Sequence, residues 1–484
     1  MSALQLNRSD LLEPRAFIGG DWVLGDRQSD IVDPSSGDII TQAADLSVFE
    51  MRQAIDAAFS AGPSWAALTA RERADVLMSW HDLLIQNQED LARILTAEMG
   101  KPIAESRGEI AYGASFIRWF AEEGRRVYGD LIPGHQPDKR IMILKQPIGV
   151  VGSITPWNFP NAMIARKVAP ALAAGCTFVG RPAEDTPLSA TAMAKLGQEA
   201  GIPDGVLNIV TGTDAAGLGK ELCANAKVRK VTFTGSTEVG RILMRQCAQN
   251  ITKLSLELGG NAPFIVFDDA DVDKAVEGAV VAKYRNGGQT CVCANRIYVQ
   301  DAIHDEFVEK LATAVSAMRV GPGAEEGNHI GPLINNAAVE KVQRHLQDSL
   351  KKGAKVVVGG GPDARGGLYF KPTVITDVAS GMTLLEEETF GPLAPVVRFT
   401  SESEVVATAN DTEFGLAAYF YTKDLSRSWR VAEALEYGIV GLNTGLISTA
   451  EAPFGGVKAS GLGREGSRYG IEDFLEIKYV CASI

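Results

Sequence analysis

The sequence predicts an α/β protein that contains two α/β domains. Its 484 residues exceed what a single hydrophobic core usually supports. Apolar strands alternate with amphipathic helices from residue 149 to residue 234, and a second alternating set begins after residue 257. Such alternation is typical of parallel sheets whose strands are joined by right-handed crossover helices.

The chain before the first alternating set is expected to be mostly helical from residue 47 onward. Apolar side chains recur every three to four positions in residues 47–59 and 71–99. Gly100 and Pro102 are expected to end the second of these helices. Residues 140–145 predict a strand.

The two alternating sets supply the sheets and the helices that cover them. In the first set, strands are expected over residues 149–154, 176–180, 207–210 and 230–234, and helices over residues 162–174 and 188–200. In the second set, strands are expected over residues 264–267, 296–299, 355–358 and 394–399, and helices over residues 272–285, 303–317 and 337–353. A last strand is expected over residues 474–481.

Composition and charge exclude several classes of function. Apolar residues make up 45% of the chain and charged residues 22%, which is typical of a globular enzyme. The net charge of −13 makes nucleic acid and anionic membranes poor partners. No apolar run reaches the length of a membrane span, and the N-terminus lacks the apolar core of a signal peptide. Six cysteines without disulfide or zinc spacing favour a cytoplasmic protein without a metal site.

A thiol and a carboxylate suggest covalent catalysis. Cys291 follows a Gly-Gly turn in the segment RNGGQTCVC, and Glu257 stands in the apolar segment LELGG. A cysteine with a nearby base can attack a carbonyl carbon. Burial among apolar neighbours is expected to raise the pKa of Glu257, which suits a base at neutral pH. The alternatives are a buried structural cysteine and a salt-bridged structural glutamate.

A possible cofactor turn lies at residues 233–240, which follow a strand and open a helix. Free amides at a helix start can hold a pyrophosphate. The spacing FTGSTEVG is not that of the GxGxxG fingerprint. A plain glycine turn with a Ser or Thr N-cap is therefore an equally good interpretation from the residues alone.

With these segments, the chain resembles the NAD(P)-dependent aldehyde dehydrogenases, and among them the succinate-semialdehyde dehydrogenases, from about residue 16 to the C-terminus. The resemblance implies a Rossmann-like cofactor domain, a catalytic domain, a small protruding oligomerisation β-sheet and a tetramer. The implied division assigns residues 1–125 and 145–257 to the cofactor domain, 258–444 to the catalytic domain, 445–467 to a return into the cofactor domain, and 126–144 and 468–484 to the oligomerisation sheet.

The resemblance also implies roles in the reaction. Cys291 attacks the aldehyde, and the Asn158 side-chain amide and the Cys291 N–H hold the oxyanion. Glu257 activates the water that hydrolyses the thioester, which favours a free acid over a coenzyme A ester as product. Lys167 and Glu465 match a proton relay, although Lys–Glu pairs are usually surface ions.

Further positions match cofactor contacts of the family. Those expected near the nicotinamide half and the pyrophosphate are Ile154, Thr155, Pro156, Trp157, Gly235, Ser236, Gly240, Leu258, Glu388 and Phe390. At the adenosine ribose, Arg181 replaces the usual lysine and suits a phosphate, whereas Glu184 would accept the ribose hydroxyls of NAD and repel a 2′-phosphate. NAD is therefore expected to be preferred, with NADP possible. Alternatively, Arg181 merely pairs with Glu184 and weakens both cofactors.

Three positions match those that hold the substrate carboxylate in succinate-semialdehyde dehydrogenases, namely Arg166, Arg285 and Ser448. Arginine binds carboxylates in a bidentate manner. The expected reaction is oxidation of succinate semialdehyde to succinate, as in 4-aminobutyrate degradation. The alternatives are glutarate semialdehyde or another short aldehyde as substrate, a coenzyme-A-acylating enzyme, a catalytically idle binding protein, and arginines that only form structural ion pairs.

Cys293 follows the nucleophile by two residues. In the resembling branch, such a second cysteine can form a disulfide with the first and switch the enzyme off under oxidation. So short a loop would make the bridge strained and easily reduced. The alternative is a thiol that never meets Cys291.

Overall fold

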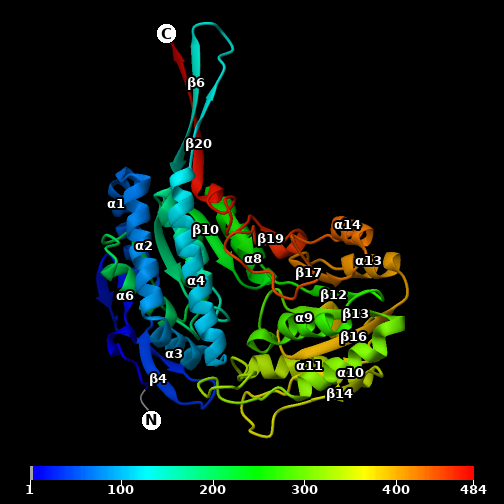
Figure 1. Cartoon of the computed structure of the whole chain (residues 1–484). Coiled ribbons are helices and arrows are strands. Elements are labelled where there is room, and N and C mark those ends of the chain that lie inside the picture. The colour runs from blue at the N-terminus through cyan, green and yellow to red at the C-terminus, as the bar shows by residue number, and fades with distance from the viewer. Residues whose placement is uncertain (1–3) are drawn as a thin grey trace.

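The structure is a computed structural model that describes residues 4–484 (Figure 1). An eight-stranded sheet and a seven-stranded sheet are each covered by helices, and a three-stranded sheet protrudes from the rest of the molecule. A two-stranded sheet near the N-terminus joins β3 (Gln28–Val32) to β4 (Ile39–Ala44). This architecture confirms the predicted fold class.

The eight-stranded sheet has the order β19-β11-β10-β7-β8-β9-β1-β2. Its strands are β1 (Ala16–Ile18), β2 (Asp21–Val23), β7 (Val150–Ile154), β8 (Thr177–Arg181), β9 (Leu207–Ile209), β10 (Val228–Thr234), β11 (Lys253–Glu257) and β19 (Gly461–Leu462). The five central strands pair in parallel, as the alternation predicted. Every residue of β7 and β8 is buried, which explains their unbroken apolar character.

Eight helices accompany this sheet. They are α1 (Val48–Ala67), α2 (Ala70–Gln86), α3 (Gln88–Met99), α4 (Ile103–Glu123), α5 (Ala162–Ala174), α6 (Leu188–Glu199), α7 (Ala215–Ala224) and α8 (Thr237–Cys247). The prediction of a single helix over residues 71–99 was wrong, because α2 and α3 are separate helices. The chain breaks at Asn87, whose side-chain amide donates to the Leu83 carbonyl at 2.8 Å and so caps α2. Gly100 ends α3 in the left-handed region, with φ of 89°.

The seven-stranded sheet has the order β14-β15-β16-β13-β12-β17-β18. Its strands are β12 (Ala262–Val266), β13 (Ala294–Gln300), β14 (Lys355–Val358), β15 (Thr373–Thr376), β16 (Leu393–Phe399), β17 (Ala417–Tyr421) and β18 (Ile439–Leu442). Its helices are α9 (Val272–Tyr284), α10 (His304–Ser316), α11 (Asn336–Lys351), α12 (Thr383–Glu386), α13 (Glu402–Asn410) and α14 (Leu425–Ala434). Local sequence patterns did not predict β15, β17, β18, α12, α13 and α14, which are short and give weak periodicity.

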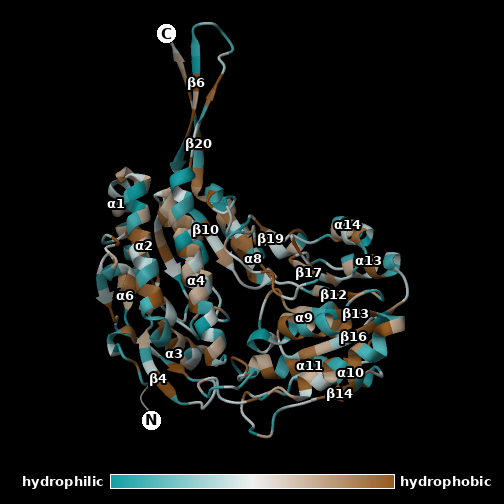
Figure 2. Ribbon diagram, in the orientation of Figure 1, coloured by the Kyte–Doolittle hydropathy of each residue, from teal (hydrophilic) through white to brown (hydrophobic). Residues whose placement is uncertain are grey.

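The protruding sheet has the order β20-β6-β5 and is antiparallel. Its strands are β5 (Asp130–Ile132), β6 (Lys139–Pro147) and β20 (Leu475–Ser483). Strand β6 continues three residues beyond the segment 126–144 expected from the resemblance. Brown, apolar stretches lie on this exposed sheet (Figure 2), and the exposed apolar side chains include Leu131, Ile477 and Tyr479.

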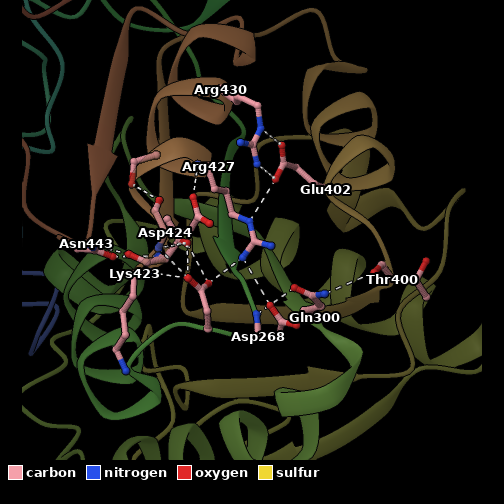
Figure 3. Close-up of polar contacts among 12 residues, drawn as sticks. Asp268, Gln300, Thr400, Glu402, Lys423, Asp424, Arg427, Arg430 and Asn443 are labelled. Carbon is pink, nitrogen blue, oxygen red and sulfur yellow. Dashed lines mark hydrogen bonds and ion pairs between the residues drawn. The ribbon is translucent and has the colours of Figure 1, made fainter.

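A polar cluster holds α14 on the seven-stranded sheet (Figure 3). Arg427 donates to Asp269, in the loop after β12, at 2.8 Å and to Glu402 at 3.1 Å. Arg430 donates to the other oxygen of Glu402 at 2.9 Å. Because α14 buries little apolar surface, these ionic contacts help to fix its position.

Within residues 4–484, no helix is both long and apolar enough to cross a membrane. The same residues contain no cluster of three or more metal-binding side chains.

Candidate active site

A cavity of about 340 Å³ lies where the two α/β units meet. The first unit lines it with Pro156, Trp157, Asn158, Met163, Thr234, Gly235, Ser236 and Leu258. The following segments line it with Gly259, Cys291, Ile334, Asn335, Ala337, Ala338, Lys341, Glu388, Thr389 and Phe390. The structure thus brings the predicted nucleophile to the same cavity as most of the predicted cofactor contacts.

The loop that carries Cys291 is shaped by left-handed residues. After α9, Asn286 and Gly287 adopt φ of 53° and 62°. At Gly288, φ is 79°, and a Cβ atom would lie 2.3 Å from the Gly391 carbonyl oxygen, so a larger residue does not fit. Burial raises the pKa of the Cys291 thiol to about 12. Cys291 is therefore a neutral thiol in this state and needs a base to become nucleophilic.

Glu257 ends β11 and is 4% exposed. Neither of its carboxylate oxygens has a hydrogen-bond partner among residues 4–484. Burial, assisted by the charge of Glu465, raises the pKa of Glu257 to about 8. Gly455 leaves room for this carboxylate, because a Cβ atom there would lie 2.8 Å from Oε1. A base with this pKa can take up and release protons near neutral pH.

Asn158 lies in the loop after β7 and is 4% exposed. Its Nδ2 donates to the Gln289 carbonyl at 3.0 Å, and its Oδ1 has no partner among the described residues. An amide nitrogen has two hydrogens, so one remains to contact a ligand. The Asn158 carbonyl accepts from Lys101 Nζ at 2.7 Å and from Asn286 Nδ2 at 3.0 Å.

The predicted relay residues meet in a buried ionic cluster. Lys167 Nζ donates to Thr234 Oγ1 at 2.6 Å and also pairs with Glu465. Arg166 Nη2 lies 2.7 Å from Glu465 Oε2, although the angle is not that of an aligned hydrogen bond. Burial alone would raise the pKa of Glu465, but Lys167 and Arg166 outweigh it and hold the pKa below its usual value. Lys167 and Glu465 are thus not surface ions.

The three predicted substrate anchors are not equivalent. Arg166 forms an ion pair with Glu465, as the alternative interpretation of this residue expected. Its guanidinium also lies 4.0 Å from the centroid of the Phe454 ring. Arg285 and Ser448 instead line a small separate cavity together. The Arg285 guanidinium lies 5.1 Å from the centroid of the Phe159 ring.

The start of α8 supplies one end of the main cavity. Gly235 and Ser236 line it, and Ser236 caps the helix by accepting from the Val239 N–H at 3.3 Å. Gly240 lets α8 approach Leu258 closely, because a Cβ atom there would lie 2.6 Å from that side chain. The free amides of this helix start fit an anionic diphosphate.

Another part of the lining is aromatic and acidic. The rings of Trp157 and Phe390 meet edge to face, with centroids 5.6 Å apart. Glu388 Oε1 accepts from the Gly260 N–H at 3.1 Å, and burial raises the pKa of Glu388 to about 7.

Five of the predicted cofactor residues do not line this cavity: Ile154, Thr155, Arg181, Glu184 and Gly240. The Ile154 side chain packs in the core of the first unit with residues such as Leu218. Thr155 is buried, and its N–H donates to the Arg181 carbonyl at 3.1 Å. The backbone of Ile154 and Thr155 leads into the loop that begins at Pro156, and neither residue lines the cavity.

Arg181 and Glu184 are paired. Arg181 Nη2 donates to Glu184 Oε2 at 2.6 Å and to the Gly212 carbonyl at 3.1 Å. Glu184 lines a second cavity of about 440 Å³, which shares Ile334 and Asn335 with the first. This pairing is the alternative that the sequence left open for Arg181.

Cys293 is buried beside Lys283. Lys283 Nζ donates to Cys293 Sγ at 3.3 Å, and Cys293 Sγ donates to the Lys283 carbonyl at 3.4 Å. All six cysteines are free thiols in this structure.

Sequence reasoning missed several residues of the site. These are Lys101, Glu109, Tyr112, Asn286, Gln289 and Lys341. Asn286 and Gln289 stand inside the nucleophile segment, where their polar side chains were a usable signal. Lys101 and Tyr112 are distant in sequence, and no local pattern distinguishes them.

Comparisons with known proteins agree with this geometry. Residues 22–480 match the Aldehyde dehydrogenase family. The chain is 60% identical to the NADP(+) succinate-semialdehyde dehydrogenase GabD of Escherichia coli, over 99% of this chain and 100% of that protein. It is 61% identical to a glutarate-semialdehyde dehydrogenase of Pseudomonas aeruginosa, over 99% of each.

Solved structures are equally similar. The crystal structure of a succinate-semialdehyde dehydrogenase from Burkholderia pseudomallei superimposes with a TM-score of 0.98 at 57% identity, covering 99% of this chain and 100% of that one. An E. coli NADP-dependent enzyme gives a TM-score of 0.98 at 60% identity, with the same coverage. This protein belongs to the aldehyde dehydrogenase family.

Proposed function

We propose that this enzyme oxidises succinate semialdehyde to succinate with NAD(P), as in 4-aminobutyrate degradation. The observation that supports it most is the joint placement of Cys291, which lines the main cavity, and the unpartnered carboxylate of Glu257. The charges of Arg166 and Arg285 lower the pKa of Cys291 against the larger effect of burial, which supports a role for both cations in this site. Relatives named as succinate-semialdehyde dehydrogenases support the substrate.

In the first step, the Cys291 sulfur bonds to the aldehyde carbon. The thiol proton leaves to Glu257, whose raised pKa lets it hold that proton near neutral pH. The carbonyl oxygen becomes an oxyanion, and the free N–H of the Asn158 side chain and the Cys291 N–H stabilise it. The product is a thiohemiacetal on Cys291.

The residues around the cavity fit a nicotinamide dinucleotide. Gly235 and Ser236 would hold its diphosphate, Glu388 a ribose, and Trp157 and Phe390 the nicotinamide end. When bound, NAD(P) accepts a hydride from the carbon attached to Cys291.

In the last step, water hydrolyses the thioester on Cys291. Before this step, Glu257 gives up the proton that it took from the thiol. It then accepts a proton from the water while the water oxygen bonds to the acyl carbon, and the C–S bond breaks to free the acid and the Cys291 thiolate. The charges of Lys167 and Glu465 act on the Glu257 carboxyl group. These two residues would pass the proton onward. A water-activating carboxylate is not needed for transfer to coenzyme A, so its presence favours the free acid.

Glutarate semialdehyde is the second candidate substrate. A relative that is 61% identical is named a glutarate-semialdehyde dehydrogenase. One methylene group changes binding by only about 1–3 kcal/mol in a pocket. Initial rates across a series of C3 to C6 semialdehydes decide between them.

For the cofactor, we propose that NAD is preferred and that NADP is also used. Glu184 would repel a 2′-phosphate, while its partner Arg181 would attract one, and the E. coli relative is named for NADP(+). Glu184→Gln should then improve kcat/KM for NADP by about tenfold relative to NAD. An unchanged ratio would show that this pair does not set the preference.

The central test is the cysteine itself. Cys291→Ala should reduce cofactor reduction with succinate semialdehyde to background, while Cys481→Ala, on the exposed strand β20, should retain activity. A higher kcat/KM for hexanal or betaine aldehyde than for succinate semialdehyde would refute the proposed substrate assignment. Undiminished turnover of Cys291→Ala would refute the mechanism and favour an idle binding protein.

We further propose a tetramer and the domain division given above. The exposed apolar residues of the protruding sheet support self-association. Six free thiols support a reducing, cytoplasmic location.

A further inference from the structure

The hydroxyl of Tyr112 is a buried polar group that no step above uses. Tyr112 lies on α4, and its oxygen has no hydrogen-bond partner among residues 4–484. Burying an unpaired hydroxyl is unfavourable, so native structures rarely keep one without a reason. A ligand that completes its hydrogen bonding is such a reason.

Two aromatic rings connect Tyr112 with the arginines of the site. Phe116, one turn along α4, meets the Tyr112 ring edge to face at 5.0 Å between centroids, and the Arg166 guanidinium lies 5.6 Å from the same Phe116 ring. Tyr112 also packs on the cluster that contains Phe159, and the Phe159 ring lies 5.1 Å from the Arg285 guanidinium. The charges of both arginines therefore act on Tyr112.

The same cluster borders the reaction centre. Met163 packs with Phe159 and also lines the cavity that contains Cys291. Burial raises the pKa of Tyr112, although the nearby arginines oppose the shift, so the hydroxyl keeps its proton at neutral pH. A protonated hydroxyl is a hydrogen-bond donor, which an anionic carboxylate requires.

We propose that the Tyr112 hydroxyl donates a hydrogen bond to the carboxylate of the semialdehyde substrate and thereby selects for aldehydes that end in an acid. This assignment rests on the proposed function. Because Arg166 also pairs with Glu465, a donor in addition to Arg285 and Ser448 would complete the contacts of the carboxylate. A neutral hydroxyl adds that donor without further charge in a buried region.

The test compares two substrates of similar length, succinate semialdehyde and butanal, in the full-length enzyme. Tyr112→Phe removes only the hydroxyl. Because hydrogen bonds to charged groups are strong, kcat/KM for succinate semialdehyde should fall by about tenfold or more, mainly through KM. The value for butanal should stay within about twofold of the wild type, because butanal has no carboxylate.

Tyr369→Phe is the matched control. The Tyr369 hydroxyl donates to the Ser35 carbonyl at 3.2 Å, so this variant should lower Tm slightly and affect both substrates equally. Tyr112→Phe loses no intramolecular hydrogen bond and should not lower Tm.

The outcomes separate the two proposals. A wild-type enzyme without preference for succinate semialdehyde over butanal would overturn the proposed function, and the role of Tyr112 with it. A wild-type preference that survives in Tyr112→Phe, or an equal loss for both substrates, would overturn only the role of Tyr112.

Discussion

Two buried glutamates near Cys291 have opposite electrostatic surroundings. Glu257 lacks hydrogen-bond partners among the described residues, and burial raises its pKa to about 8. Glu465 contacts Lys167 and Arg166, which hold its pKa below the usual value. Environments that push two carboxyl pKa values apart separate their roles. Glu257 can hold a proton near neutral pH, whereas Glu465 is an anion at rest and takes up a relayed proton only transiently.

Replacing Glu257 by Gln should slow the attack of Cys291, because the acceptor of its proton is lost, and should block hydrolysis of the thioester that still forms. We expect kcat to fall by about 10²–10⁴-fold, the usual contribution of a general base. Mass spectrometry of the mixed enzyme and substrate should detect the acyl-enzyme. Asp269→Asn, in the polar cluster at α14, serves as a remote control. Wild-type turnover in Glu257→Gln would exclude Glu257 as the base.

The rate should depend on pH through Glu257. Its carboxylate is the active form, so kcat should rise with pH through an apparent pKa near 8. The negative charge of Glu465 raises the pKa of Glu257, and Glu465→Gln removes that charge. The same substitution frees Arg166 and Lys167 from their ion pairs, and both of these cations lower the pKa of Glu257. The acid limb of the pH profile should therefore move to lower pH. A limb that stays in place or moves upward contradicts the proposed coupling.

Reversible inactivation by hydrogen peroxide is expected to require Cys293. Before Cys293 can form a disulfide with Cys291, it must lose its hydrogen bonds with the amine and the carbonyl of Lys283. Inactivation should therefore be slow and readily reversed by thiols. Cys293→Ser should be inactivated without recovery, and Cys247→Ser should behave like the wild type. Equal recovery in Cys293→Ser would show that Cys293 is a bystander.

At the scale of elements, α4 and the turn before it hold the loop that carries Asn158. Lys101 Nζ donates to Glu109 Oε2 at 2.5 Å and to the Asn158 carbonyl at 2.7 Å. Glu109 Oε1 in turn accepts from the Asn161 N–H at 3.0 Å and from the Ala162 N–H at 3.2 Å, at the start of α5. One fully buried ion pair thus positions both the predicted oxyanion donor and a helix start.

Lys101→Met should impair stability and catalysis together. It leaves the Glu109 charge buried without its partner, which costs about 3–5 kcal/mol in the free energy of unfolding. Adding Glu109→Gln should restore part of that stability but not kcat, because Asn158 still lacks its support. Urea denaturation and kcat measure the two effects.

Arg427→Ala is the control at the same scale. It removes the ionic contacts of α14 and should lower stability without changing kcat (Figure 3). A stable Lys101→Met variant with unchanged kcat would show that the ion pair is only structural.

At the scale of the molecule, the active site exists because two α/β units share one cavity. Cys291 approaches from the second unit, and Asn158 and the start of α8 approach from the first. The protruding sheet pairs strands from residues 130–147 with the C-terminal strand β20 (Figure 1). Its exposed apolar residues would be unfavourable in water unless another copy covers them.

A charge on that sheet should therefore weaken assembly. Ile477 and Tyr479 are 68% and 57% exposed on β20. The double variant Ile477→Lys, Tyr479→Lys should elute as a smaller species in size-exclusion chromatography with light scattering. Cys481→Ser on the same strand should keep the wild-type mass. An unchanged mass in the lysine variant would place the interface elsewhere.

The sequence by itself determined the fold class, most of the buried strands, and the likeness that singled out Cys291, Glu257 and Asn158. Those features are local, because apolar periodicity and short motifs depend on neighbouring residues. Only the tertiary structure decided that α2 and α3 are separate helices, that the Ile154 side chain packs in the core, and that Arg166 pairs with Glu465.

These contacts join residues far apart in the chain. Lys167 and Glu465 are separated by 298 positions, and Lys101 and Asn158 by 57. Burial and charge pairing at such separations depend on how whole elements pack, and no local pattern encodes them. The apolar neighbours of Glu257 already predicted its raised pKa, but the effect of the Glu465 charge on Glu257 and the unpaired hydroxyl of Tyr112 became visible only in the folded chain.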